Sequence, residues 1–478
     1  MRKSIASLVA ITGFFMAMLL LTVKLFPQVG DVIFAKNHES TGIIAAQNYK
    51  IIKEIKLGAV KPMLSKQMGS TGGIIKISPT KKHFAVGTDS GKIIVLKNDG
   101  EFLWEIGSET DKISDICFDR DDRYLIVGEE SPRLAVRCFD LSNGKEIWHQ
   151  EFGTELGYDL KNKIYPSINS IITDCNNDIY VVAQNYSFTP AKTREYISKI
   201  YKLKINGKVI ASYPEKDMID ANVLSISVTN DGKKVFFPAA NYYQRDNLHF
   251  DQNLYCINDE LSEILWTMKF NAVAPNRVSA IRRAPDIDND MMALIISDGR
   301  CLAYDFDGNE KWQQQVSVPQ KVFGIYLSPS GVNCMINNGH VFFVTSNTTN
   351  RINSQVPISI EHPSSNSVFI FDSFGKFLRK IPFDGMIGGR TGQIEFDGDN
   401  LVVAIGANTV TGNRENHGVY VVNYRTGDLI ENIKTEGPCI SAAMDNGLKH
   451  IALIEAPLKD DQGIIHGEYC LYVLEKKE

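Results

Sequence analysis

One pattern recurs along the chain: an apolar run, a short polar turn and a second apolar run. It occurs eight times, in IIKISPTKKHFAVG, ISDICFDRDDRYLIVG, INSIITDCNNDIYVVA, VLSISVTNDGKKVFFP, VSAIRRAPDIDNDMMALII, VFGIYLSPSGVNCMI, GQIEFDGDNLVVAIG and ISAAMDNGLKHIALI. Turn residues between alternating apolar runs are typical of β-hairpins. A hairpin repeated along the whole chain restricts it to an array of similar modules.

A second hairpin follows most of the first ones, as in GKIIVLKNDGEFLWEIG, RLAVRCFDLSNGKEIW and RCLAYDFDGNEKW. Two hairpins make a four-stranded module, and the period of about 41 to about 70 residues is within or above the range of propeller blades. Such a small sheet cannot bury both faces alone, and a closed ring of sheets buries them all. The repeat therefore predicts an all-β chain, a single β-propeller of four-stranded antiparallel blades.

Every tryptophan of the chain follows a predicted turn and enters the fourth strand of a module. A large ring there is half exposed unless a neighbouring blade covers it. We therefore interpret four residues as blade-docking side chains: Trp104, Trp148, Trp266 and Trp312.

The last module lacks one strand. It has its first hairpin and a third strand, EYCLYVLE, and then the sequence ends, whereas Asn48 to Gly58 (NYKIIKEIKLG) has no partner near it. We expect this N-terminal strand to complete the last blade and close the ring, which gives eight blades. Seven is the alternative, because GHVFFVTSN and SVFIFDS compete to be the third strand of the sixth module.

The N-terminus contains an uncharged stretch, SIASLVAITGFFMAMLLLTV, between Lys3 and Lys24. It is long enough to cross a membrane as one helix, and Arg2 and Lys3 favour a cytoplasmic N-terminus. We expect residues 1–26 to be a single-pass plasma-membrane anchor, 27–47 a linker, and 48–478 a periplasmic or cell-surface propeller. A signal peptide cleaved near Val32 to Ala35 is the alternative, although apolar signal cores usually span only about 7 to 15 residues.

Charge and cysteine usage exclude several classes of protein. The net charge of −5 and the lack of a basic stripe with interleaved aromatics exclude a nucleic-acid partner. The eight cysteines include no CxxC motif. Cys117 and Cys138, like Cys439 and Cys470, fall on predicted first and third strands about 9 to 10 Å apart. Disulfides need Cα atoms within about 7 Å, so we expect free thiols in the core.

The longest loops are predicted on one face, where second strands connect to third strands and blades to one another. Long polar loops with aromatics on a rigid scaffold commonly carry binding residues, and Tyr and Arg are enriched at protein interfaces. The alternative is that these aromatics pack their own loops against the blades. The candidate binding residues are Tyr186, Phe188, Tyr196, Tyr242, Tyr243, Arg245, His249 and Phe250.

No motif in the sequence points to catalysis or to a cofactor. The stretch DIDND offers Asp286, Asp288 and Asp290 at alternate positions, as calcium loops do. However, no Gly or distant acidic residue completes such a loop, and DRDDR and DCNND occupy the same turn in other modules. We therefore interpret the aspartates as turn residues and expect neither a metal nor a cofactor.

The repeat FDLSNGKEIW resembles the blade motif of the pyrroloquinoline-quinone-like propeller superfamily, and LSPSG and SPTKKHFAVG are similar to WD-like and YVTN-like repeats. The resemblance covers Asn48 to the C-terminus and implies the fold. Enzymes of this superfamily carry a vicinal disulfide, calcium ligands and a catalytic Asp, whereas this chain has no adjacent cysteines. The resemblance thus implies the non-enzymatic branch, which includes a scaffold lipoprotein of outer-membrane barrel assembly. This chain departs from that protein in lacking a lipid-bearing Cys after its apolar segment.

These observations predict a membrane-anchored, extracytoplasmic propeller without catalysis that binds a protein or an envelope polymer through its long loops. A degenerate quinoprotein-like enzyme, or a hydrolase that uses the central funnel, is the alternative.

Overall fold

The computed structural model describes residues 43–65, 72–107, 112–190, 194–243, 249–271, 281, 283–350, 358–388 and 392–478. The chain separates into two units, 1–40 and 41–478, and only the second lies within the described residues. The expected anchor, residues 1–26, lies outside them. Among the described residues, no helix combines the length and apolarity needed to cross a membrane.

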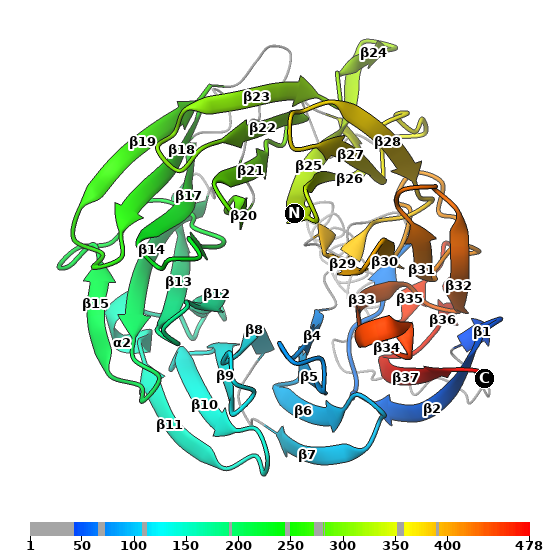
Figure 1. Ribbon diagram of the computed structural model, residues 1–478, viewed down its shortest axis with the longest axis horizontal. Coiled ribbons are helices and arrows are strands. Elements are labelled where there is room, and N and C mark those ends of the chain that lie inside the picture. Colours follow the sequence, from blue (N-terminus) through cyan, green and yellow to red (C-terminus); the bar gives the residue numbers. More distant parts are fainter. Residues whose placement is uncertain are drawn as a thin grey trace, which may run out of the picture. The chain divides into compact units, whose positions relative to one another are not determined.

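Residues 41–478 form consecutive four-stranded antiparallel blades that follow one another around a ring (Figure 1). Each blade runs outward from its innermost strand, in chain order except in the last blade, whose outermost strand is β2 (Tyr49–Lys56). The first four blades consist of β4 (Gly73–Ile77), β5 (His83–Thr88), β6 (Lys92–Lys97) and β7 (Phe102–Gly107); β8 (Lys112–Phe118), β9 (Tyr124–Glu130), β10 (Ala135–Asp140) and β11 (Glu146–Glu151); β12 (Ser167–Thr173), β13 (Ile179–Phe188), β14 (Arg194–Leu203) and β15 (Val209–Tyr213); and β16 (Ser227–Val228), β17 (Lys234–Tyr243), β18 (His249–Asn258) and β19 (Ile264–Phe270).

The blades that follow consist of β20 (Asp286–Asp288), β21 (Met291–Ile295), β22 (Arg300–Tyr304) and β23 (Glu310–Gln315); β25 (Ile325–Asn337), β26 (His340–Asn350), β27 (Ser367–Asp372) and β28 (Phe377–Pro382), with β24 (Gln320–Val322) beside β25; β29 (Ile394–Asp397), β30 (Asn400–Ile405), β31 (Gly418–Asn423) and β32 (Leu429–Thr435), with β1 (Ile43–Ala45) beside β32; and β33 (Cys439–Met444), β34 (His450–Glu455), β37 (Cys470–Lys476) and β2 (Tyr49–Lys56). Short elements lie between them: α2 (Gly153–Leu156), η2 (Asn446–Leu448), β3 (Met63–Leu64), β35 (Leu458–Lys459) and β36 (Ile465–His466).

The hydrophobic core lies between blades. Each cluster of buried side chains draws on two consecutive blades, as where Ala85 and Val95 pack with Ile116 and Val127. The same holds along the chain, and a final cluster joins the last blade to the β4–β7 blade. A blade therefore depends on its neighbours for burial, as the repeat predicts.

The N-terminal strand closes the ring, as predicted. β2 pairs antiparallel with β37, from Tyr49 opposite Lys476 to Lys56 opposite Cys470. The Tyr49 hydroxyl donates a 2.6 Å hydrogen bond to the carbonyl oxygen of Leu448. β1, which lies in the expected linker, pairs with β32.

The tryptophans dock between blades, also as predicted, and the structure shows what receives them. Each indole N–H donates to a carbonyl in the turn between the third and fourth strands of the next blade, at 2.8 to 3.1 Å: Trp104 to Leu141, Trp148 to Ile205, Trp266 to Phe306 and Trp312 to Ser373. The ring lies against the glycine of that turn: Gly144, Gly207, Gly308 and Gly375. The repeated Gly therefore accommodates the tryptophan of the preceding blade rather than its own.

The prediction for the sixth module is wrong in one respect: LSPSG is not a hairpin turn. Residues Ile325–Asn337 form one strand, β25, whose pairing with β26 shifts register on both sides of Gly331. These bulges absorb Pro329 within the strand, and the turn lies instead at Asn338 and Gly339, both with positive φ. SVFIFDS forms the third strand, β27, and GHVFFVTSN the second.

All eight cysteines carry free thiols, as predicted, although Cys175 is exposed in the β12–β13 turn.

Candidate functional site

Two adjacent blades carry hairpins that extend beyond the rest of their sheets. β13 and β14 pair over ten residues each, up to Phe188 opposite Arg194. However, β12 covers β13 only as far as Gln184, and β15 covers β14 only from Ile200. The end of this hairpin is therefore a two-stranded ribbon, which we call the β13–β14 tip (Asn185–Phe188 and Arg194–Ile197).

The β13–β14 tip brings together three of the predicted binding residues. The ring centroid of Tyr186 lies 5.6 Å from that of Phe188 and 5.9 Å from that of Tyr196. The Arg194 guanidinium lies over the Tyr186 ring, 4.6 Å from its centroid. Phe188 is 51 % exposed, so the cluster presents an aromatic and cationic surface. Arg194 was not among the predicted residues, and the β-hairpin register is the signal that would have placed it opposite Phe188.

The neighbouring β17–β18 hairpin carries the remaining candidates. Tyr242 pairs with Phe250 and Tyr243 with His249 along the backbone, at the end of the hairpin. Arg245 lies outside the described residues. Both hairpins join a second strand to a third, so the strand order places them on the same face of the ring.

The β30–β31 loop, in contrast, is held by hydrogen bonds to the connection between β28 and β29. In that connection, Asp384 accepts from the side-chain amides of Asn408, Asn413 and Asn416 at 2.6, 2.7 and 2.8 Å. This loop is therefore fixed against the connection from the preceding blade.

The aspartates of DIDND do not converge. Asp286 accepts the backbone N–H of Ile336 at 2.6 Å, whereas Asp290 pairs with Lys311 at 2.9 Å. Within the described part of the chain, no group of three or more His, Cys, Asp or Glu side chains is placed to hold a metal ion. Asp286 and Asp288 lie on strand β20, so only Asp290 lies in the turn before β21. In the DRDDR turn, Asp119 accepts the N–H groups of Arg123 and Tyr124, as a turn aspartate does.

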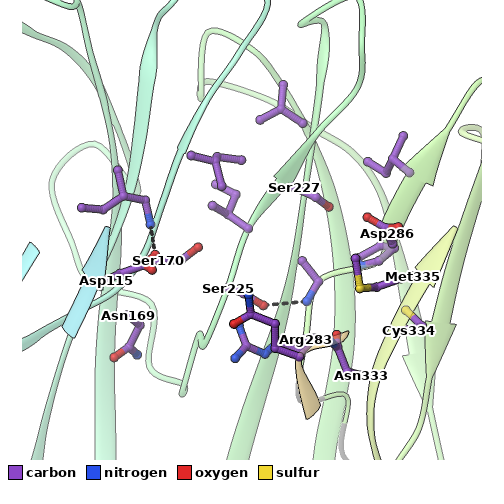
Figure 2. Close-up of a pocket in the computed structure, with 18 of the residues that line it drawn as sticks. Asp115, Asn169, Ser170, Ser225, Ser227, Arg283, Asp286, Asn333, Cys334 and Met335 are labelled. Atoms are coloured by element: carbon purple, nitrogen blue, oxygen red, sulfur yellow. Dashed lines mark hydrogen bonds between the residues drawn. The ribbon is translucent and has the colours of Figure 1, made fainter. Parts of the chain in front are cut away.

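The innermost strands line a cavity of about 460 Å³ in the middle of the ring (Figure 2). Four of its charged lining residues were missed by the sequence interpretation, namely Lys76, Asp115, Arg283 and Glu395, whereas the fifth, Asp286, had been interpreted as a turn residue. The repeat contains the signal for several of them, because polar residues recur on the innermost strands, as in IIKIS, ISDIC and GQIEF.

Polar side chains around this cavity, which we call the central channel, join neighbouring innermost strands. Asp115 accepts the N–H of Ile171 at 2.7 Å, and Ser225 accepts that of Ala284 at 2.7 Å. Ser441 accepts the N–H of Ile75 at 3.2 Å, across the closure of the ring. These bonds satisfy backbone groups where adjacent sheets diverge.

Burial dominates the electrostatics of the channel. It raises the pKa of Asp115, while Lys76 and Arg283 act in the opposite direction. It also raises the pKa of Asp286 to about 6. Carboxyls here are held by fixed hydrogen bonds in a partly dehydrated site.

Comparison with known proteins supports the fold. Residues 75–171 match the family model of the anaphase-promoting complex subunit 4 WD40 domain. None of the curated proteins matches the sequence.

Among solved structures, the chain is similar to BamB from Moraxella catarrhalis, at 12% identity and a TM-score of 0.52, covering 90% of this chain and 98% of that one. It is also similar to the C-terminal WD40 domain of Sif2, at 9% identity and a TM-score of 0.53, covering 91% and 100%. The computationally designed Ika8 protein matches at 11% identity and a TM-score of 0.50, covering 87% and 100%. Together with the sheets described above, these matches show a β-propeller with WD40-like repeats.

Proposed function

We propose that this propeller is a non-catalytic scaffold that binds a partner protein through the face that carries the β13–β14 tip and the β17–β18 hairpin. The observation that carries the proposal is the cluster of Tyr186, Phe188 and Arg194. It lies on the two-stranded end of the hairpin, which pairs with neither β12 nor β15. WD40 propellers commonly bind proteins, which favours a protein over an envelope polymer.

The geometry of the tip suits recognition. A two-stranded ribbon is only marginally stable by itself, and here Asn185 donates hydrogen bonds to the carbonyl oxygens of Leu156 and Gly157, at 3.2 and 2.8 Å. Lys199 also pairs with Glu155 at 2.5 Å. The aromatic cluster is thus presented on an anchored support, which reduces the entropy lost on binding.

Three further features belong to this proposal. The ring has eight blades, because in the described residues eight hydrophobic clusters each join two consecutive blades, and the last of them returns to the first blade. Residues 1–26 anchor the protein in the plasma membrane, with the propeller on the extracytoplasmic side. Finally, the chain belongs to the non-enzymatic branch of the pyrroloquinoline-quinone-like superfamily.

The test is co-purification from detergent-solubilised membranes with the triple variant Tyr186→Ala, Phe188→Ala, Arg194→Ala. The control is Phe374→Ala, an 87 % exposed aromatic in the β27–β28 turn on the opposite face. We expect a partner with the wild type and with the control, and its loss with the triple variant. Equal recovery of the same partners with all three proteins would overturn the proposed face.

A further inference from the structure

The central channel contains charged residues that the proposed scaffold function does not use. Lys76 on β4, Asp115 on β8, Arg283 just before β20, Asp286 on β20 and Glu395 on β29 all line its wall. All five are half-buried, and charges partly removed from water are costly unless they are paired.

Among the described residues, neither Arg283 nor Lys76 has an acceptor at hydrogen-bonding distance. Both act electrostatically on Asp115, whose carboxylate already accepts the N–H of Ile171. Two cations therefore act on one carboxylate, which leaves an excess of positive charge around Asp115. Figure 2 shows Arg283 beside Ser225, between the strands with Asp115 and those with Asn333.

Two further carboxyl groups, those of Asp286 and Glu395, line the same cavity. Asp286 accepts the N–H of Ile336, and Glu395 accepts a 2.6 Å hydrogen bond from the side chain of Gln393. Neither carboxyl forms an ion pair with a described cation. Asn333 lies on β25, the innermost strand between β20 and β29, and donates to the carbonyl oxygen of Gly392 at 3.2 Å.

We propose that the channel binds a zwitterion, with its carboxylate on Arg283 and Lys76 and its ammonium group facing Asp286 and Glu395. Free amino acids and short peptides share this chemistry. The planar guanidinium matches a carboxylate with two parallel hydrogen bonds. A phosphate dianion fits less well, because three carboxyl groups line the same cavity. The volume of about 460 Å³ falls in the range of about 300 to 1,000 Å³ typical of small-ligand sites.

The experiment is calorimetric titration of the full chain with alanine, trialanine, N-acetyl-trialanine and trialanine amide. We expect alanine or trialanine to bind, and which of the two binds more tightly identifies a free amino acid or a peptide as the source. Blocking either charge is expected to weaken binding by at least about tenfold, since each charge-assisted contact is lost. No binding of either free ligand, or equal binding of a blocked one, would refute the proposal.

Variants locate the site. Arg283→Gln is expected to abolish binding, whereas the control Arg425→Gln, in an exposed pair with Asp399, is expected to leave it unchanged. Asp115→Asn keeps an acceptor for Ile171 and removes the competing carboxylate, so it is expected to bind the free ligand more tightly. If Arg283→Gln does not fold, the tighter binding expected of Asp115→Asn is the test of the site. Unchanged or weaker binding by Asp115→Asn then counts against the site. The Tyr186, Phe188, Arg194 triple variant is expected to bind the zwitterion normally, which separates this proposal from the loop-face function.

Discussion

At the scale of single residues, a glycine and a tryptophan on different blades act as one unit. A Cβ atom at Gly207 would lie 2.6 Å from the Trp148 ring, and the φ of this glycine is 85°. The tryptophan positions can be predicted from sequence because they share one place in the repeat. The partner of each tryptophan could not be, because spacing along the chain associates Gly144 with Trp148, whereas the fold places Trp104 over Gly144.

Gly207→Ala tests this unit against a control, Gly447→Ala. Gly447 also has positive φ, 72°, with ψ 14°, but nothing lies within 4 Å of its would-be Cβ. Both changes place a Cβ atom at positive φ, so the extra loss at Gly207 is assigned to the clash with Trp148, expected at about 1 to 3 kcal/mol. Urea unfolding of both variants gives the difference. Equal losses would contradict the docking role.

Glu455 gives a pH-dependent prediction at the same scale. It is fully buried, accepts the N–H of Gly437 at 2.6 Å, and burial raises its pKa to about 8 from 4.5. Between pH 4.5 and about pH 8, Glu455 keeps its proton in the folded state and releases it in the unfolded state. Stability from this group is therefore complete below about pH 4.5 and declines as the pH rises to about 8, by up to about 1.4 kcal/mol per pH unit. Glu455→Gln is expected to flatten this part of the stability curve, measured by urea unfolding from pH 5 to 9. A slope identical to that of the wild type would exclude Glu455 as its source.

At the scale of elements, hairpins follow from alternation and turn residues, and most were predicted. β25 was not, because Pro329 and Gly331 have turn chemistry, yet the strand absorbs them as bulges packed against β21. The length of the β13–β14 tip was not predicted either. The alternation of apolar and polar residues along β13 and β14 does not show where the flanking strands β12 and β15 stop pairing with them. The channel residues were missed for a related reason: polar positions on an innermost strand look like ordinary solvent-facing alternation until a ring encloses them.

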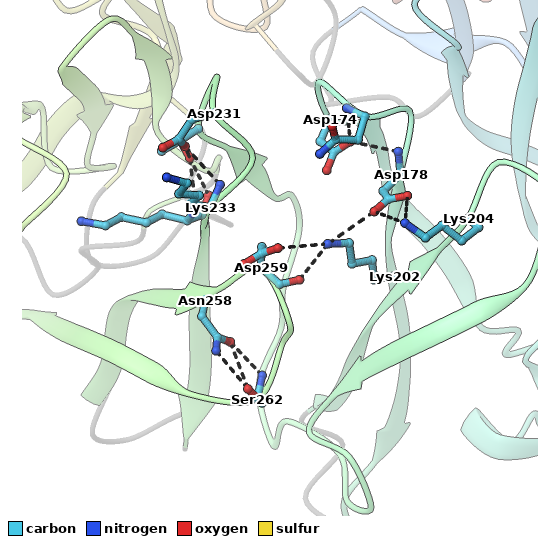
Figure 3. Close-up of polar contacts among 12 residues, drawn as sticks. Asp174, Asp178, Lys202, Lys204, Asp231, Lys233, Asn258, Asp259 and Ser262 are labelled. Atoms are coloured by element: carbon cyan, nitrogen blue, oxygen red, sulfur yellow. Dashed lines mark hydrogen bonds and ion pairs between the residues drawn. The ribbon is translucent and has the colours of Figure 1, made fainter.

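Ion pairs between elements provide the next prediction. Lys202 on β14 is 6 % exposed and reaches Asp178 and, in the next blade, Asp259, each at 3.5 Å (Figure 3). Asp178 also binds Lys204 at 2.8 Å. Asp178→Asn leaves the buried Lys202 ammonium undercompensated, so we expect a loss of about 3 kcal/mol. The control Asp290→Asn disrupts an exposed pair with Lys311 and is expected to match the wild type. Thermal unfolding compares the two, and a neutral Asp178→Asn would show that Asp259 alone suffices.

At the scale of the whole molecule, the two ends of the propeller meet in one sheet. β2 forms the outer strand of the last blade and also reaches the first, where the Ile52 side chain lies 3.3 Å from the Cβ position of Gly100 in the β6–β7 turn. Ile52 thus takes the place that tryptophan holds in other blades. Closure of the ring could be predicted, because the last module lacks a strand and the N-terminal strand lacks a partner. In contrast, nothing in the local sequence indicates that Ile52 occupies the docking position in place of a tryptophan.

A cut in the chain tests the closure. With a protease site inserted between Ala59 and Val60, cleavage separates β2 from the rest of the propeller covalently. We expect the N-terminal fragment to stay bound during gel filtration, because the backbone pairing with β37 and the buried Tyr49 remain. Unfolding of the cut protein should then depend on its concentration, since folding has become a binding reaction. Ile52→Asp in the cut protein is expected to release the fragment by placing a charge against the β6–β7 turn. If the fragment separates without denaturant in the parent sequence, the ring is closed by contacts other than β2.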